Sequence, residues 1–321
     1  QEIEIMANVQ QSIAQYPNGF TSGVTVRGFP ILNTYSGNIW WVDSNGAQTG
    51  DGKFNRPFAT IDTAINHAAA DDIILVKSGH AETITTAAQL VPDVAGVSII
   101  GLGYGTRRPT LTFGAAAANI PVSAANVSFQ NILFKANFAD VVSFITIAAA
   151  AEFSVRNCEF RDTSSILNAL TCVTTTVTVN ADGFEFIGNK VYSLGTTAAT
   201  TMIVIAGTMS RCTINDNLYI GAVLNNTAAL LEHGALNVTN LEMARNRVSR
   251  PNTDTATGAM LIKTAATANT GIVYNNYVGC LDVAGVILLT AGSDYSPIEN
   301  YVTGEVDKSG WLIPAAGTDA V

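Results

Sequence analysis

Acidic side chains are the residues of this chain whose types could carry chemistry. Glycoside hydrolysis needs two carboxylates about 5 to 10 Å apart, one as a proton donor and the other as a base or nucleophile. On a repetitive fold, such a pair would occupy equal positions in neighbouring repeats. Glu159 and Glu185 lie at offsets +2 and −4 from a recurring asparagine, so their positions differ. We interpret the remaining acids as equally unmatched surface residues: Asp162, Asp182, Asp216 and Glu242.

The other titratable groups also form no recognisable site in the sequence. His67 falls in an expected helix, His80 in a turn after an expected strand, and His233 at a corner between strands. The glycine-rich run 101–105 is too short, and wrongly placed, to bind a nucleotide phosphate. The sequence therefore predicts no catalytic residues, no cofactor, no metal site, and a chain that is not an enzyme.

Four cysteines are spread along the chain without the Cys-x-x-Cys spacing of common metal sites. They are Cys158, Cys172, Cys212 and Cys280, and each falls in or beside an expected strand. Free cysteine is among the most buried residue types. We interpret the four as buried free thiols, with a metal site or a disulfide as the alternatives.

A short strand-like run recurs along the chain and positions all of these residues. Runs such as 127–134, 153–160 and 184–192 alternate apolar and polar residues, lead into an asparagine and then resume. Alternation with period two is typical of β-strands. The asparagines are Asn131, Asn157, Asn189, Asn217, Asn246, Asn276 and Asn300, at successive spacings of 26, 32, 28, 29, 30 and 24 residues.

A second apolar run follows each asparagine by roughly a dozen residues. Examples are 143–148, 172–177 and 202–207, and most of these runs end in Ala, Gly or Thr. Each repeat thus reads as strand, corner, strand, corner, and one copy cannot bury its apolar face alone. Stacking the copies buries that face, so the sequence predicts an all-β, single-stranded parallel β-helix whose asparagines stack at one corner.

The composition agrees with extensive apolar contact and with an acidic chain. Hydrophobic residues make up 48% of the 321 residues and charged residues 13%, with a net charge of −9. No Lys/Arg run appears, so we expect no nucleic-acid partner. No apolar stretch approaches the 18 or so residues that a membrane-spanning helix needs, so we expect no membrane partner.

Two regions differ from the repeats. Residues 1–38 are irregular and are predicted to form an extended N-terminal arm, with at most one strand in 23–32, before a β-helix over 39–321. A helix is predicted over about 56–70, because Pro57 opens it and apolar residues recur on one face. Whether residues 1–5 belong to the native chain stays open.

The run 55–84 (NRPFATIDTAINHAAADDIILVKSGHAETI) followed by 97–111 (VSIIGLGYGTRRPTL) resembles the first segment of the pectin-lyase-like right-handed β-helix superfamily. In that superfamily a helix closes the open end of the solenoid. Residues 7–32 joined to this segment are similar to a group of β-helix proteins encoded by tailed bacteriophages. The resemblance implies a right-handed β-helix with a capping helix and a phage origin.

Two functions from different classes stay open from the sequence. The first is a non-enzymatic bacteriophage structural protein, a trimeric head decoration or fibre-like protein of the virion assembled in the host cytoplasm. Its N-terminal arm would attach it to the capsid or another virion protein. The attachment or oligomer contacts would be Phe20, Phe29, Ile31 and Leu32.

The second function is that of a tail spike or adsorption protein that binds or cleaves a glycan of the host surface. Such a surface needs outward acids or aromatic residues aligned along one face. The aromatic candidates Tyr192, Tyr219, Tyr274 and Tyr277 have different offsets from the recurring asparagine, so no alignment is expected.

Overall fold

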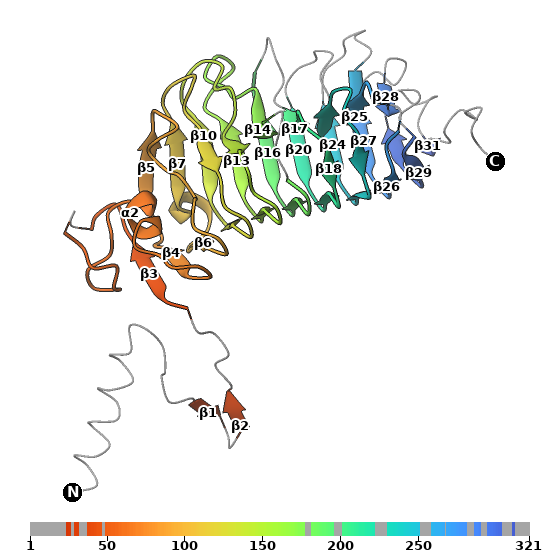
Figure 1. The fold of residues 1–321 in the computed structure, drawn as a ribbon. Helices are drawn as coiled ribbons and strands as arrows, with labels where there is room; N and C mark the ends of the chain where they lie inside the picture. The colour runs from red at the N-terminus through yellow and green to blue at the C-terminus, as the bar shows by residue number, and fades with distance from the viewer. Residues whose placement is uncertain are drawn as a thin grey trace, which may run out of the picture.

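The chain folds into a parallel β-solenoid, as a computed structural model shows (Figure 1). Three sheets run along it, two with ten strands each and one with seven. This arrangement confirms the all-β parallel solenoid predicted from the repeats. The structure describes residues 24–26, 29–31, 37–46, 49–176, 181–195, 201–221, 230–250, 258–266, 268–280, 286–289, 294–303 and 310–311.

Sheet 1 contains the strands that precede the recurring asparagines. Its strands are β3 (Ile39–Val42), β4 (Ile73–Val76), β6 (Ser98–Gly101), β9 (Ser128–Gln130), β12 (Ser154–Arg156), β15 (Glu185–Ile187), β19 (Thr213–Asn215), β23 (Leu241–Ala244), β26 (Gly271–Tyr274) and β29 (Ser296–Ile298).

Sheet 2 contains the strands that follow the asparagines. They are β5 (Ala81–Ile84), β7 (Thr110–Phe113), β10 (Leu133–Ala136), β13 (Glu159–Asp162), β16 (Lys190–Ser193), β20 (Leu218–Gly221), β24 (Arg247–Arg250), β27 (Tyr277–Cys280), β30 (Tyr301–Thr303) and β31 (Gly310–Trp311). The last of these, β31, pairs antiparallel with β30, whereas the other pairs in this sheet are parallel.

Sheet 3 closes each coil. Its strands are β8 (Ile120–Val122), β11 (Ile145–Ile147), β14 (Thr171–Thr175), β17 (Thr201–Ile205), β21 (Leu231–His233), β25 (Gly258–Thr264) and β28 (Val286–Leu289). Two short strands, β18 (Met209–Ser210) and β22 (Val238–Thr239), pair beside these sheets, and a 3₁₀ turn, η1, covers Gly105–Arg107.

Each full coil thus has three strands, whereas the sequence predicted two. The run 153–160, interpreted as one strand, is divided into β12 and β13 by a turn at Asn157 and Cys158. Asn157 has a φ of 54°, a left-handed conformation that a strand cannot contain. Because the period-two pattern continues across this turn, the sequence did not indicate that a corner divides the two strands.

The recurring asparagines occupy two different positions at this corner. Five of them are buried and form a ladder: Asn189, Asn217, Asn246, Asn276 and Asn300. Asn131 and Asn157 lie one position earlier, at the left-handed residue, and Ile132 and Cys158 take the buried position after them. The prediction that Asn157 stacks with the later asparagines was therefore wrong by one residue.

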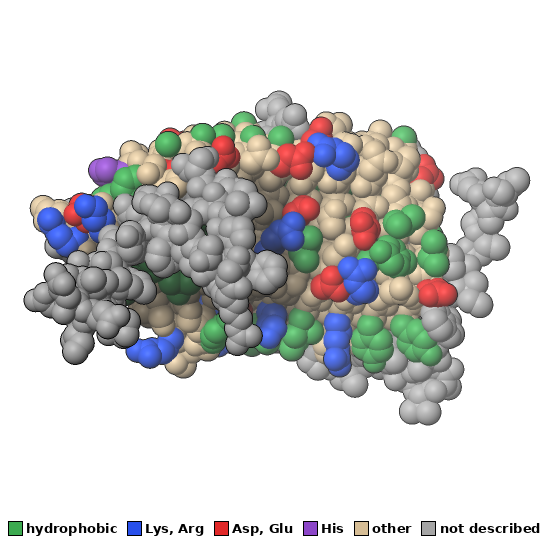
Figure 2. Space-filling view, turned by 90° about the horizontal axis from the view of Figure 1, so that it is seen from below, with side chains coloured by type: hydrophobic (Ala, Val, Ile, Leu, Met, Phe, Trp, Pro, Cys, Tyr) green, Lys and Arg blue, Asp and Glu red, His purple; other side chains and the backbone are tan. Residues whose placement is uncertain are grey.

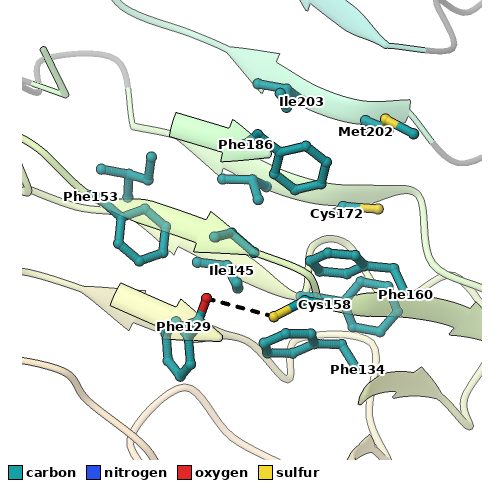
Figure 3. Packing of buried hydrophobic residues seen from close by; sticks show 14 of the residues in the cluster. Phe129, Phe134, Ile145, Phe153, Cys158, Phe160, Cys172, Phe186, Met202 and Ile203 are labelled. Carbon is teal, nitrogen blue, oxygen red and sulfur yellow. Dashed lines mark hydrogen bonds between the residues drawn. The ribbon is translucent and has the colours of Figure 1, made fainter. Parts of the chain in front are cut away.

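The core is a continuous apolar interior that runs along the solenoid. Phe134 and Phe160 lie at paired positions of β10 and β13, and their rings stack with centroids 4.8 Å apart. Phe129 of β9 and Phe153, which precedes β12, continue this packing. The Sγ atom of Cys158 lies 3.7 Å from the carbonyl oxygen of Phe129 (Figure 3). Parallel stacking places like side chains over one another, because equal positions of successive coils face the same interior.

The helix near the start of the solenoid is shorter than predicted. Helix α2 covers Ile61–Ile65, and the Oγ1 atom of Thr60 caps it by accepting a hydrogen bond of 3.2 Å from the N–H of Thr63. Ile61, Ala64 and Ile65 are buried in the core. Whether α2 acts as a cap that closes the solenoid stays a prediction. No helix among the described residues is long and apolar enough to cross a membrane.

Candidate functional site

The predicted attachment residues fall in and around a small hairpin. Strands β1 (Val24–Val26) and β2 (Phe29–Ile31) pair antiparallel, with Val24 opposite Ile31 and Val26 opposite Phe29. The sequence allowed one strand at most in this region, so the second strand is a correction. Phe29 and Ile31 lie in β2, whereas Phe20 and Leu32 lie outside the described residues. Among the described strands, β1 and β2 pair only with each other.

Two of the acidic residues interpreted as unmatched share one register on the outer face of sheet 1. Glu185 of β15 pairs with Thr213 of β19, and Thr213 pairs with Glu242 of β23. The two glutamates are therefore two strands apart, which corresponds to about 9.5 Å along the sheet. The sequence held the signal, since each glutamate precedes its buried asparagine, Asn189 or Asn246, by four residues. The interpretation of Glu242 as unmatched was wrong.

Glu242 is held by two neighbouring side chains on this face. Its carboxylate accepts hydrogen bonds of 3.0 Å from the Nδ2 of Asn215 and 3.0 Å from the hydroxyl of Tyr274. Asn215 is itself buried, and its Oδ1 accepts a hydrogen bond of 2.8 Å from the N–H of Ala244. Because both the oxygen and the nitrogen of the Asn215 amide are hydrogen-bonded, this side chain holds the carboxylate of Glu242 in one position.

Ion pairs continue along the same side of the solenoid (Figure 2). Arg156 of β12 pairs with Glu185 in the next coil. At the corner between sheets 1 and 2, Arg245 binds both carboxylate oxygens of Asp216, at 2.7 and 2.8 Å. These hydrogen bonds lower the pKa of Asp216 below its ordinary value. Each of these two ion pairs therefore joins side chains of neighbouring coils on this side of the solenoid.

The remaining acids interpreted as unmatched have structural partners. Asp162 points into the solenoid and accepts a hydrogen bond of 2.9 Å from the N–H of Ala169 and one of 2.7 Å from the N–H of Leu194. Burial raises the pKa of Asp162 above its ordinary value. Glu159 accepts a hydrogen bond of 3.0 Å from Arg108. The contact with Leu194 joins neighbouring coils, that with Arg108 spans two coils, and that with Ala169 lies within one coil, which indicates a role in stability.

The aromatic candidates are divided between faces. Tyr219 is fully buried, whereas Tyr274 lies on the outer face of sheet 1. Tyr192 and Tyr277 lie on the outer face of sheet 2 at different positions of the strand, so they do not align with each other. Tyr277 does align with Tyr301 in the next coil, a pair that the sequence did not single out.

The three histidines lie in different surroundings. His80 is buried, with Nε2 3.2 Å from the Glu82 carboxylate, and His67 is exposed on the turn after α2. His233 is buried, with Nε2 3.0 Å from the Tyr295 hydroxyl and Nδ1 2.9 Å from the Thr264 hydroxyl. Burial lowers the pKa of His233. Within the described residues, no group of three or more His, Cys, Asp or Glu side chains could hold a metal ion.

The three cysteines whose side chains are described are buried and free. Cys158, Cys172 and Cys212 make no disulfide, which agrees with the first interpretation of the cysteine pattern. Burial raises the pKa of Cys158 and of Cys212 to about 12. The side chain of Cys280 lies outside the described residues.

Comparison with known proteins shows similarity at the level of the fold. A rhamnogalacturonan lyase is 10% identical, over 86% of this chain and 89% of its own length, with a TM-score of 0.45. A pectate lyase is 14% identical, over 83% and 77%, with a TM-score of 0.47. A lacto-N-biosidase from Eubacterium ramulus is 9% identical, over 83% and 68%, with a TM-score of 0.36. No protein-family model matches the chain, and no curated protein matches it in sequence.

These comparisons correct the prediction that the chain is not an enzyme. The similar solved structures are named as lyases and a glycosidase, so the prediction is contradicted and we withdraw it. The reasoning behind that prediction also fails, because it assumed that no two acids align, whereas Glu185 and Glu242 do. With identities of 9–14% the likeness extends to the fold alone, and it assigns no substrate to this chain.

Proposed function

We propose that this chain is a virion protein of a tailed bacteriophage. In this proposal a homotrimer of solenoids stands on the particle, most simply as a head decoration or fibre-like protein, and is attached through the N-terminal residues 1–38. Helix α2 closes the first coils of each right-handed solenoid.

One observation carries the proposal. The first described strands, β1 and β2, pair only with each other among the described strands, and sheet 1 begins at Ile39. A hairpin whose two strands pair with no described strand of the solenoid sheets is available to contact another protein. The resemblance of residues 7–32 to phage β-helix proteins supports the same reading.

Deletion of residues 7–37 tests the attachment. We expect the truncated protein to keep the β-sheet circular dichroism and the thermal unfolding temperature of the full chain, and to lose binding to purified particles. Sedimentation of the full chain should show three copies per assembly. Binding of the truncated protein at full strength, or a full-length chain that sediments as a monomer, would contradict the proposal.

A second candidate function has a specific observation in its favour, namely the register of Glu185 and Glu242. Two carboxyl groups roughly 6.5 to 9.5 Å apart can act as acid and base in an inverting glycosidase, with room for a water between them and the sugar. Two strand spacings of about 4.8 Å place the backbone positions of these glutamates at a separation near the upper end of that range. On this reading, the outer face of sheet 1 binds or cleaves a host-surface glycan.

Product analysis separates the two candidates. Purified protein is incubated with pectin, alginate and the host capsule polysaccharide, and new reducing or unsaturated ends are measured. If sheet 1 is catalytic, Glu185→Gln and Glu242→Gln each remove the signal. The matched control is Glu232→Gln on the outer face of sheet 3, which should leave the signal unchanged. Equal products from all variants would remove this candidate.

A further inference from the structure

The edge between sheets 1 and 2 has an unusually constant shape. From β9 to β30, each strand of sheet 1 is followed by its strand in sheet 2 after two residues, from 131–132 to 299–300. The connections from sheet 2 to sheet 3 are longer, as in 137–144 and 163–170. No loop therefore protrudes along this edge over seven successive strand pairs. Another molecule can approach both adjoining faces closely along this length.

The outer face of sheet 2 is basic although the chain is acidic. Along its outward positions lie Lys135, Arg161, Lys190 and Arg247, with Glu159 as the acid among them, a local net charge of +3 in a chain of −9. No ion pair among the described residues involves Lys190 or Arg247. Arg247 lies over the ring of Tyr277, 5.6 Å from its centroid.

The outer face of sheet 1, with the turn that leads into it, has the opposite sign. Acids outnumber bases there. The acids are Asp71, Glu152, Asp182, Glu185, Glu242 and Asp294, and the bases are Arg156 and Arg211. Glu242 accepts hydrogen bonds from Asn215 and Tyr274, and no described cation pairs with it. The two faces that meet at the smooth edge are therefore complementary in charge.

The complementary charges also lie at equal heights along the solenoid. Glu185 of β15 and Lys190 of β16 belong to one coil, and Glu242 of β23 and Arg247 of β24 belong to another. If two copies stand side by side with parallel axes and no vertical shift, the acids of one coil face the bases of the same coil in the neighbour.

Exposed apolar side chains follow the same two faces. Ile272 and Ile298 on sheet 1 are 43% and 51% exposed, and Ile220 and Tyr277 on sheet 2 are 38% and 36% exposed. Exposed apolar side chains among complementary charges are typical of protein contact surfaces.

We propose that a second copy of this chain covers these faces, with the outer face of sheet 2 of one copy packed on the outer face of sheet 1 of the next. Two different faces of one copy then meet two neighbours, which is the heterologous contact that closes into a ring. This arrangement rests on the homotrimer of the proposed function and identifies the faces that form it. Sheet 3, with its longer loops, faces outward.

A charge exchange within one coil tests the arrangement. Arg247→Glu makes both faces acidic at this height, and Glu242→Arg makes both basic, so each should raise the concentration needed for half-assembly about tenfold or more. The double variant restores opposite charges at the interface and should return to within about threefold of the wild type. Sedimentation velocity over a concentration series gives these values.

The matched control is the same exchange on sheet 3. Glu232 and Lys263 form a partly exposed ion pair there at 2.8 Å, and Glu232→Lys with Lys263→Glu should leave assembly unchanged. Thermal unfolding of each variant confirms that it is folded. If Arg247→Glu or Glu242→Arg fails to fold, Arg247→Gln and Glu242→Gln take their places, with weakened assembly again expected.

The outcomes separate this inference from the proposal on which it rests. A wild-type chain that sediments as a monomer overturns the homotrimer and this inference with it. A wild-type trimer that is unaffected by the single exchanges, or not restored by the double exchange, overturns the assignment of faces and leaves the trimer standing. A trimer weakened by the control on sheet 3 overturns the assignment as well.

Discussion

Asn217 donates two hydrogen bonds to the side-chain oxygen of Asn246 in the next coil, one from Nδ2 at 2.9 Å and one from its main-chain N–H at 3.0 Å. Asn246 repeats this contact towards Asn276 and also donates 2.7 Å to the carbonyl of Ile214. Each buried amide thus satisfies backbone groups that the left-handed corner leaves without a partner in the sheet. The ladder links the coils at the one corner where each coil turns within two residues.

Replacing one member of this ladder should destabilise the solenoid. Asn246→Leu leaves the N–H of Asn217 and the carbonyl of Ile214 buried without partners, and we expect a loss of ~1–3 kcal/mol in the free energy of unfolding. Asn137→Leu, at an exposed loop position, serves as the control and should change it by no more than about 0.5 kcal/mol. Urea unfolding followed by circular dichroism measures both. Equal losses for the two variants would show that the ladder has no special role.

The stacked phenylalanines should contribute more than any exposed aromatic residue. Phe160 is 1% exposed and packs against Phe134, Phe144 and Phe186, so Phe160→Ala should cost ~3–5 kcal/mol through lost apolar contact and the cavity left behind. Phe138 is 44% exposed, and Phe138→Ala should cost far less. The comparison of the two unfolding curves is the measurement, and a loss below about 1 kcal/mol for Phe160→Ala would contradict the described packing.

The described thiols should be unreactive in the folded protein. Reaction with a disulfide reagent requires an accessible thiolate. Burial raises the pKa of Cys158 and Cys212 to about 12, and that of Cys172 well above its ordinary value of 9.0. In a Cys280→Ser background, Ellman's reagent should therefore detect no thiol at pH 8 before unfolding and three after it. Rapid labelling of the native variant would be the contrary result.

Acid should weaken the folded state through His233. Burial lowers its folded-state pKa below the ordinary value of 6.5, so the unfolded chain binds a proton at higher pH than the folded protein does. The free energy of unfolding is unaffected by this group above pH 6.5 and falls as the pH is lowered from 6.5 towards the folded-state pKa.

Variants of two histidines isolate this contribution. His233→Gln should have a flatter pH dependence than the wild type between pH 6.5 and 5, whatever its own stability at neutral pH. His67→Gln removes an exposed histidine and should keep the wild-type slope. Urea unfolding at several pH values gives the slopes, and an unchanged slope in His233→Gln would refute the assignment.

Much of the fold could be predicted because the repeats are written in local patterns. Strands such as β9 and β12 lie in runs that alternate apolar and polar residues, and β3 and β4 are short, wholly apolar runs. Their apolar side chains must stack, because no single coil can bury them. The corners were harder to predict. A turn of two residues, such as 157–158, does not interrupt the alternation of apolar and polar residues. The two strands and the turn between them therefore look like one strand in the sequence.

The candidate site was missed for a related reason. Register on a solenoid depends on how many residues each coil spends in its turns, and a shift of one residue reverses the direction of a side chain. Asn157 and Asn189 look equivalent in the sequence, yet the first takes the left-handed position and the second the buried one. The comparison of Glu159 with Glu185 used these two different reference points, and the equal offset of Glu185 and Glu242 from their buried asparagines was overlooked.

The sequence by itself determined that this protein is a solenoid, because period-two alternation repeated every 24 to 32 residues can bury its apolar face only by stacking parallel copies. Tertiary structure alone decided which residues share a face. The hydrogen-bonded register of parallel strands placed Glu185 in line with Glu242 on sheet 1, and Lys190 and Arg247 on sheet 2. The separation of acidic and basic side chains onto two faces depends on strand pairing between residues about 30 positions apart in the sequence. A local sequence pattern does not contain this pairing.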